Sequence, residues 1–209
     1  MEKLDLTKKY KVCYQAKATV EEVTIEDAGY LAVEGKGDPS APEFSKNVEA
    51  LYGIAYTIKF MCKDKGLDFV VPKLEAQWWY DELKYVALTP EESALKVPRS
   101  EWQYQLMIRM PDWVSNEIFD EGVRKAFAKK GNEKMKDVKL IRFEPGRCVQ
   151  ILHTGPFSDE PNSLVKISQY MDLHSLVKNG RHHEVYLSDF NKVEEAKLKT
   201  ILRELVVEK

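Results

Sequence analysis

Cysteine is scarce in this chain, and long apolar runs and an excess of either charge are absent. Only Cys13, Cys62 and Cys148 occur among 209 residues, an odd number without the spacing of metal ligands. We therefore expect three reduced thiols rather than a disulfide framework. No apolar run is long enough to cross a bilayer, and Met1–Asp5 does not begin like a signal peptide. These absences predict a cytoplasmic protein without a membrane partner.

The charge balance and the glycine and histidine patterns exclude further classes of protein. The 32 Lys and Arg residues nearly balance the 34 Asp and Glu residues, and a net charge of -2 argues against a nucleic-acid partner. Gly35 and Gly37 are too few for a phosphate-binding loop. His182 and His183 are adjacent, and neighbouring side chains of a strand face opposite sides, so the pair is poorly placed to share a metal ion. We expect neither a metal nor another cofactor.

Hydrophobic periodicity predicts an α+β fold. Apolar residues alternate in some segments and recur at helical spacing in others, with Pro and Gly between them. The expected strands cover residues 20–34, 74–85, 101–110, 138–143, 148–153, 181–189 and 201–207. The expected helices cover residues 42–63, 113–131 and 160–178. Residues 1–18 are expected to form an arm on the surface, and residues 89–93 a polar linker.

The order of the expected elements repeats once. Residues 30–37 align with residues 148–155 at an offset of 155 − 37 = 118, and each copy is followed by a Pro-containing turn, a long helix and strands. We predict one domain over residues 1–209, built from tandem strand–helix–strand–strand halves at about 20–110 and 137–207. The helix over about 113–131 would join them. A pseudo-twofold axis would relate the halves, with helices on one face of the sheet and a shared ligand cleft on the other.

The segment Arg181–Asp189 has the strongest functional signal. It alternates polar and apolar residues, which predicts a strand. Side chains two residues apart share a face, so His182, Glu184 and Tyr186 point one way, and the alternate residues can pack against a helix layer. On a wetted surface Glu184 would be an ordinary acid. In an aromatic cleft, desolvation would make it a stronger base and a candidate general base.

Aromatic residues indicate what such a cleft would bind. Four Trp and ten Tyr offer more amphipathic ring surface than a core requires. Flat rings that line a concave site suit a planar apolar ligand. Trp79, Trp102 and Tyr104 lie on two expected strands, and Tyr56 lies on the first expected helix. The alternative interpretation assigns these rings to the hydrophobic core.

The chain resembles the GyrI-like small-molecule-binding proteins. The matching segments are residues 30–39, 49–59, 72–79, 107–112, 153–157 and 181–189, which together span nearly the whole chain. The doubled tryptophan Trp78-Trp79 and the segment His182-His183-Glu184 resemble the stand-alone branch of that family. Residues 80–82 depart from the family pattern.

The resemblance implies a cleft that binds hydrophobic, planar and often cationic compounds around a central acid, the position that Glu184 matches. Relatives in the stand-alone branch hydrolyse the strained cyclopropane of DNA-alkylating compounds and so protect the cell. Other relatives bind drugs as the sensing half of transcription regulators or interact with DNA gyrase. We expect a hydrolase of cyclopropanoid compounds, with drug sequestration or a gyrase interaction as alternatives.

The resemblance, together with the strand pattern, also gives the expected site residues. Glu184 would be the general base, and Tyr186, Tyr104 or His182 would stabilise the oxyanion. We take Glu184 and Tyr186 as the catalytic pair. The expected ligand-binding residues are Trp79, Trp102, Tyr104, Phe157, His182 and Tyr56.

Overall fold

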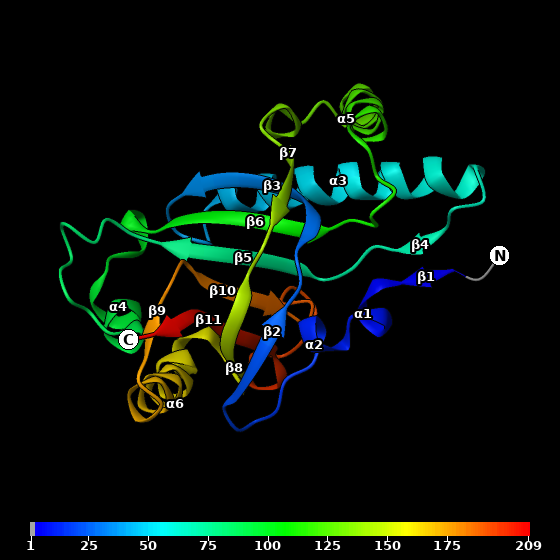
Figure 1. Ribbon diagram of the computed structural model, residues 1–209. Helices are drawn as coiled ribbons and strands as arrows, with labels where there is room; N and C mark the ends of the chain where they lie inside the picture. The colour runs from blue at the N-terminus through cyan, green and yellow to red at the C-terminus, as the bar shows by residue number, and fades with distance from the viewer. Residues whose placement is uncertain (1–2) are drawn as a thin grey trace.

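The computed structural model describes residues 3–209 and confirms the α+β prediction (Figure 1). The strands are β1 (Leu4–Asp5), β2 (Glu21–Ile25), β3 (Ala28–Lys36), β4 (Phe69–Val70), β5 (Leu74–Trp79), β6 (Gln103–Arg109), β7 (Lys139–Phe143), β8 (Gly146–Thr154), β9 (Leu176–Lys178), β10 (His182–Tyr186) and β11 (Lys199–Glu208). The α-helices are α1 (Leu6–Lys9), α2 (Lys11–Tyr14), α3 (Pro42–Asp64), α4 (Pro90–Lys96), α5 (Asn116–Lys130) and α6 (Glu160–Leu173). Short 3-10 helices cover Arg99–Glu101, Glu133–Lys136, Phe157–Asp159 and Glu195–Lys197.

One large antiparallel sheet organises the molecule. Its strand order is β2-β8-β11-β10-β5-β6-β3-β7, and β9 pairs with the end of β11. Strand β10 lies at the centre, where Glu184 faces Ala76 of β5 on one side and Leu202 of β11 on the other. Because directly paired residues of an antiparallel sheet point to the same face, Ala76, Glu184 and Leu202 share one face.

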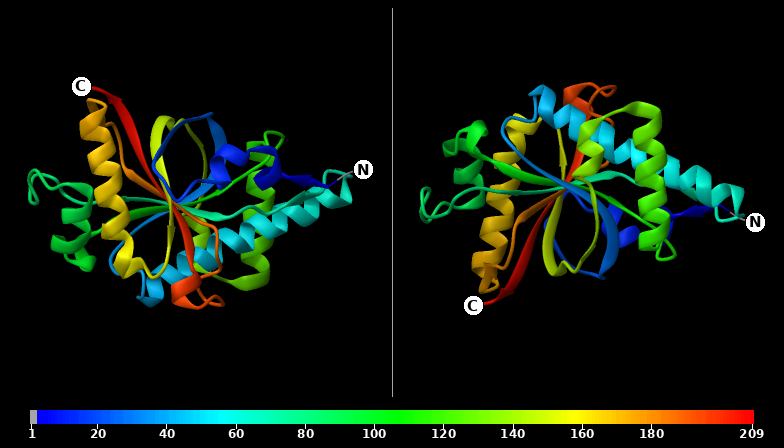
Figure 2. Two further views of the ribbon diagram at one scale, coloured as in Figure 1. Left: turned by 90° about the horizontal axis from the view of Figure 1, so that it is seen from below. Right: turned by 90° about the horizontal axis from the view of Figure 1, so that it is seen from above.

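The long helices α3 and α6 both cover the face that carries Glu184. Ile54 and Ile58 of α3 belong to the same buried cluster as Ala76, and Ile167 of α6 packs in the cluster that contains Leu202. Each helix thereby removes apolar surface of the sheet from water, the main favourable contribution to folding. In Figure 2 the two helices begin close together and then diverge, and residues of their first turns line a cleft.

The prediction that helices and cleft would occupy opposite faces is wrong. The first turns of α3 and α6, with Phe44 and Glu160, line the same cleft as Glu184. The two helices diverge from this point, so the uncovered part of the sheet lies between them, on their own face. The strand alternation correctly sets which side chains share a face, but it carries no information about which face the helices take.

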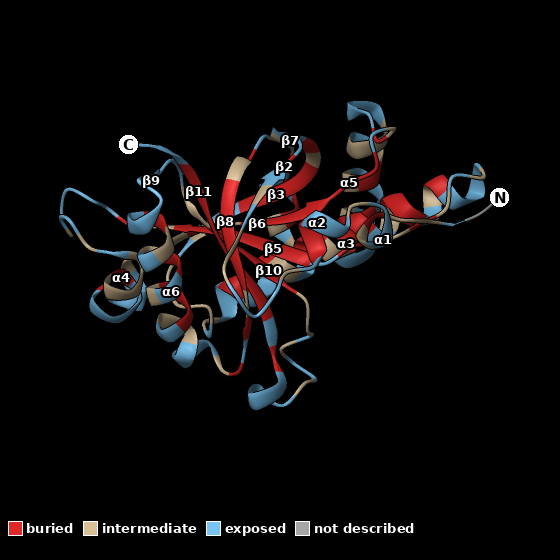
Figure 3. Ribbon diagram, turned by 60° about the horizontal axis from the view of Figure 1, so that its bottom comes forward, coloured by how far each residue is buried: buried red, intermediate tan, exposed pale blue. Residues whose placement is uncertain are grey.

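The opposite face of the sheet is closed by the N-terminal segment. The expected surface arm instead buries Cys13 and Tyr14 of α2 against Val185 of β10. The buried guanidinium of Arg203 donates to Gln150 Oε1 at 2.8 Å and to the Cys13 carbonyl at 3.1 Å. Figure 3 shows buried residues concentrated along the central strands. Residues 1 and 2 of the expected arm lie outside the described residues.

The structure corrects three expected element boundaries. The strand predicted over 74–85 ends at Trp79, and the expected linker at 89–93 contains the start of α4. The Thr89 hydroxyl accepts from the Glu92 N–H, and the Glu92 carboxylate accepts from the Thr89 N–H, a capping box that begins a helix. Helix α6 stops at Leu173 rather than 178, since Ser175 has a left-handed φ of 54°. Among residues 3–209, no helix combines the length and apolar character needed to cross a bilayer.

Gly35 of β3 gives a test of the packing beneath the cleft. It lies opposite Tyr104, and the Cβ of an alanine at 35 would lie 2.3 Å from Tyr104 Cζ. Tyr104 is fixed between the rings of Phe44 and Trp78, at centroid distances of 5.1 and 5.5 Å, and has little room to move. We expect Gly35→Ala to lower the free energy of unfolding by about 1–3 kcal/mol in denaturant titration.

The matched control is Gly29→Ala on the same strand, where no heavy atom lies within 4 Å of the added Cβ. This substitution should change the free energy of unfolding by less than about 0.5 kcal/mol. Equal stability losses in the two variants would contradict the packing explanation.

Candidate functional site

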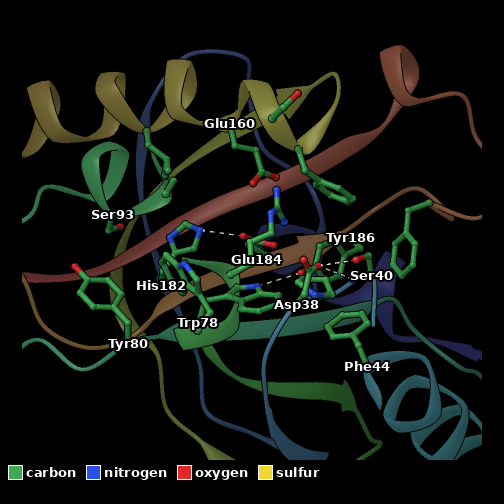
Figure 4. A pocket seen from close by; sticks show the side chains of 18 of the residues that line it. Asp38, Ser40, Phe44, Trp78, Tyr80, Ser93, Glu160, His182, Glu184 and Tyr186 are labelled. Carbon is green, nitrogen blue, oxygen red and sulfur yellow. Dashed lines mark hydrogen bonds and ion pairs between the residues drawn. The ribbon is translucent and has the colours of Figure 1, made fainter. Parts of the chain in front are cut away.

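A cleft of about 1080 Å³ lies over the centre of the sheet, between the first turns of α3 and α6 and the segment that joins β5 to β6 (Figure 4). This volume is at the upper end of the range of small-molecule sites. Its floor is the cleft-facing side of β10, where His182, Glu184 and Tyr186 follow at alternate positions. The aromatic residues that line it are Phe44, Trp78, Tyr80, Trp102, Phe157, Tyr186 and Phe190.

A buried imidazole lies between two carboxylates on the cleft floor. His182 Nδ1 lies 2.6 Å from Glu204 Oε1, and His182 Nε2 lies 3.4 Å from Glu184 Oε1. Burial alone would lower the pKa of His182, but Glu204 and Glu184 outweigh it and raise the pKa to about 10. In turn, burial favours a neutral Glu204, yet His182 overcomes this effect and lowers the pKa of Glu204. The two groups therefore form a buried ion pair.

Glu184 occupies the centre of the site and is only 8% exposed. Besides the imidazolium at 3.4 Å, its near neighbour is Tyr186, whose pKa is raised well above 10 by burial and then by the Glu184 carboxylate. The Tyr186 hydroxyl accepts a hydrogen bond from Trp78 Nε1 at 3.2 Å. Tyr186 is therefore held as a neutral phenol beside the central acid.

A third acid, Glu160, enters the cleft from α6. Figure 4 shows its side chain reaching from the helix toward Glu184 on the strand below. Glu160 Oε1 is buried and has no hydrogen-bond partner among residues 3–209. Burial, and then repulsion by Glu184, raise the pKa of Glu160 well above 4.5, although His182 and Arg99 act in the opposite direction. Glu184, Glu204 and Glu160 thus place three carboxyl groups in the cleft, in different electrostatic environments.

The aromatic walls form two groups of contacting rings. Trp78 stacks on Phe44 with a centroid distance of 6.1 Å and contacts Trp102 edge-on at 6.3 Å. On the other side, Phe157 contacts Tyr186 at 6.0 Å and Phe190 at 6.3 Å. Such contacts hold the rings in fixed orientations. The walls are therefore suited to a flat apolar ligand.

Five of the predicted site residues lie together in the cleft, namely Glu184, Tyr186, Trp102, Phe157 and His182. Three others lie outside it. The Trp79 ring is covered by the Arg181 guanidinium at 3.5 Å, on the sheet face opposite to Trp78. Tyr104 is only 1% exposed and lies in the core, while Tyr56 is 46% exposed and stacks on Tyr52.

Sequence reasoning missed Trp78, Glu160 and Glu204. Trp78 pairs with His182 across β5 and β10, so strand register rather than composition decides which tryptophan faces the cleft. Glu160 is the first residue of a helix, where an acidic residue is common and does not indicate a functional site. Arg203 and Glu204 interrupt the apolar residues of β11, and these two charges between Leu202 and Leu205 were the available signal for buried polar contacts.

The chain is similar to one protein family and to several solved structures. A family model described as the GyrI-like small molecule binding domain matches residues 115–203. A hydrolase from Listeria innocua is 37% identical, with a TM-score of 0.84, over 98% of this chain and 100% of that one. An uncharacterized conserved protein from Listeria innocua is also 37% identical, with a TM-score of 0.87 over the same shares. The C-terminal domain of EcmrR, at 12% identity and a TM-score of 0.53 over 91% of this chain and 98% of that one, is similar in fold alone. No functionally curated protein matches the chain.

The ion pair predicts a measurable change in proton binding. In Glu204→Gln the main charge that stabilises the imidazolium is lost, so His182 should bind its proton at least ~10-fold more weakly than in the wild type. Imidazole NMR signals followed from neutral to alkaline pH should show wild-type His182 titrating near pH 10 and the variant titrating clearly lower. An unchanged midpoint in Glu204→Gln would contradict the ion pair.

The ion pair between His182 and Glu204 also determines how the stability of the fold depends on pH. The pKa of His182 rises from 6.5 to about 10 on folding, so protonation stabilises the fold fully below pH 6.5 and this contribution is lost as pH rises through 10. The matched control is Glu194→Gln, which removes a surface carboxylate paired with Lys197 and should leave the His182 titration unchanged.

Proposed function

Because the chain belongs to the GyrI-like small-molecule-binding family, we propose that it is a hydrolase that opens the cyclopropane ring of planar, electrophilic compounds with water. The observation that carries the proposal is the central Glu184 carboxylate, buried on the floor of a cleft walled by aromatic rings. The 37% identity to hydrolases over nearly the full chain supports the class of reaction.

The chemistry assigns Glu184 the role of general base. A cyclopropane joined to a conjugated dienone is opened when a water oxygen bonds to a ring carbon and the strained C–C bond breaks. The electron pair of that bond moves through the conjugated ring to the carbonyl oxygen, and Glu184 takes the proton from water. A positioned general base contributes roughly 10²–10⁴ in rate.

The neighbours of Glu184 supply orientation and hydrogen bonding. His182 directs one ring nitrogen to Glu204 and the other to Glu184, so its role is to orient and charge-balance the base. Of the tyrosines considered for the oxyanion, Tyr186 lines the cleft, whereas Tyr104 lies in the core. We therefore favour Tyr186 as the hydroxyl donor to the substrate.

We also infer that the fold arose by duplication of one strand–helix–strand–strand unit. Strands β2 and β7 differ in their starting residue by 139 − 21 = 118, strands β3 and β8 by 146 − 28 = 118, and helices α3 and α6 by 160 − 42 = 118. The sheet order β8-β11-β10 followed by β5-β6-β3 is consistent with a pseudo-twofold axis between β10 and β5. The catalytic cleft would then lie between halves at about 20–110 and 137–207, joined by α5 within one domain.

A binding protein without turnover is the rival function. The acidic floor and the aromatic walls also suit a planar cation held by charge and by cation–π contacts. In that case, Glu184 would pair with the drug rather than activate water. The two functions share the cleft and differ in whether product forms.

The first test is turnover of a cyclopropane-bearing alkylating compound, followed by mass spectrometry. The wild type should yield a product heavier by one water molecule. Glu184→Gln should lose roughly 10²–10⁴ of the rate while it retains binding, because the amide keeps the shape but cannot take a proton. Glu194→Gln, which alters an exposed acid that does not line the cleft, is the matched control and should retain full rate.

The outcomes separate the rival functions. Tight binding by the wild type with no product would support sequestration, and the absence of both would leave a protein partner such as gyrase as the remaining alternative. Full activity in Glu184→Gln would exclude this residue as the base.

The second test concerns the aromatic wall. Trp102→Leu removes a ring that lines the cleft, and we expect the Kd for a flat aromatic ligand to rise by about 10-fold, since an aromatic pair adds about 0.5–1.5 kcal/mol beyond its buried area. Trp79→Leu, on the other face of β5, should change the Kd by less than about 2-fold. Fluorescence titration of both variants checks this, and equal losses would argue against the assigned cleft.

A further inference from the structure

The mechanism above leaves Glu160, whose buried Oε1 atom lies in the cleft, without a role. We propose that Glu160 is the general acid of the site, a neutral carboxyl that donates its proton to the substrate oxygen on which negative charge develops. This inference rests on the proposed hydrolase function and completes it, because an oxygen that gains an electron pair during ring opening requires a proton donor.

The position of Glu160 fits that role. It reaches into the cleft from α6, whereas Glu184 lies on β10 below, so the two carboxyl groups enter the same cleft from different elements (Figure 4). Its Oε1 atom is buried and without a partner among the described residues. A buried carboxylate without a partner is costly. A protonated carboxyl group avoids this cost, and its O–H can donate a hydrogen bond to a substrate carbonyl.

The charges around Glu160 also favour its neutral form. The groups that face it are Glu184, which opposes ionisation, and His182 and Arg99, which favour it. His182 already interacts with Glu204 at 2.6 Å and with Glu184 at 3.4 Å, so its charge is largely balanced. Burial and the Glu184 carboxylate therefore hold the pKa of Glu160 well above its ordinary value.

The other candidate acids of the cleft are less suitable. Burial and Glu184 raise the pKa of Tyr186 well above 10, so its phenol can donate a hydrogen bond but releases its proton reluctantly. Both ring nitrogens of His182 point to carboxylates rather than into the open cleft. Arg99 lines the cleft and can donate hydrogen bonds, but a guanidinium does not serve as a general acid. Glu160 is the remaining group that combines a transferable proton with a free direction into the cleft.

The proposed step balances in atoms and charge. The water oxygen bonds to the cyclopropane carbon as Glu184 accepts a water proton, and the strained C–C bond breaks toward the ring. The electron pair reaches the carbonyl oxygen, which takes the proton of Glu160 and becomes a phenol. Glu160 ends as a carboxylate and Glu184 as a carboxylic acid, and exchange with solvent protons restores both. Paired acids with separated proton affinities are a common arrangement for such chemistry.

The test combines pH profiles with a pair of substrates. For the wild type we expect kcat/KM to fall at alkaline pH, where Glu160 ionises. Glu160→Gln should lower kcat by about 10²–10⁴ at neutral pH, lose that alkaline decline and keep ligand affinity within about 3-fold. Glu194→Gln, which alters an exposed acid that does not line the cleft, should retain the wild-type profile.

A structural role for Glu160 would not depend on the substrate, so the second comparison uses two cyclopropyl dienones. One carries an electron-withdrawing group that makes its product phenol more acidic. That substrate needs less protonation in the transition state, and Glu160→Gln should slow it less than the unsubstituted compound. Equal losses on both substrates, or a persistent decline in Glu160→Gln at a pH below the His182 titration near 10, would overturn the assignment.

An infrared difference spectrum between wild type and Glu160→Gln adds a readout that needs no substrate. It should show the C=O stretch of a protonated carboxyl at neutral pH, and its absence would overturn the proposal. Turnover by the wild type together with unchanged kinetics in Glu160→Gln would reject Glu160 as the acid and leave the hydrolase function standing. No turnover by the wild type would reject both proposals, and bound ligand without product would then mark the cleft as a binding site only.

Discussion

The pairing register of β10 between β5 and β11 is the constraint on which the rest of the site depends. Glu184 lies opposite Ala76 and Leu202, two residues that sit beneath the helices, and this register fixes its side chain on the helix-covered face. A shift by one residue would send Glu184 to the back of the sheet and bring His183 into the cleft. Every other feature of the cleft floor, including the imidazolium between two carboxylates, follows from this alternation.

The back of the sheet holds the register in place with a second buried polar group. His183 Nε2 lies 3.0 Å from Glu75 Oε2, and the hydroxyl of Tyr14 donates to the other oxygen of Glu75 at 3.0 Å. Because breaking such a buried contact leaves an unpaired polar group, a slipped register would carry a large penalty on both faces at once. The N-terminal segment that supplies Tyr14 therefore contributes to the site without touching the cleft.

Much of this arrangement could be predicted from the sequence where the spacing of apolar residues within one segment determines the structure. Alternation placed His182, Glu184 and Tyr186 on one face, and helical spacing found α3 and the start of α6 to within a residue. Choices that depend on contacts between distant segments could not be made in that way. The ring that faces the cleft is Trp78 rather than Trp79, and Glu204 of β11 meets His182 across the sheet, because of strand pairings that no local pattern encodes. The face covered by α3 and α6 was likewise a tertiary outcome.

The proton on Glu160 links the hydrolase and binding interpretations of the same cleft. If Glu184 and Glu204 are ionised and His182 is protonated, these three groups sum to a net charge of about -1, and ionisation of Glu160 on α6 would bring the sum to about -2. A neutral electrophile gains nothing from the additional charge, so the neutral acid that serves ring opening can persist while such a substrate is bound. A cationic ligand would instead favour ionisation of Glu160, and its binding would release a proton to solvent. Under the proposed function, the charge of the ligand would therefore decide whether the site acts as an acid–base pair or as a cation trap.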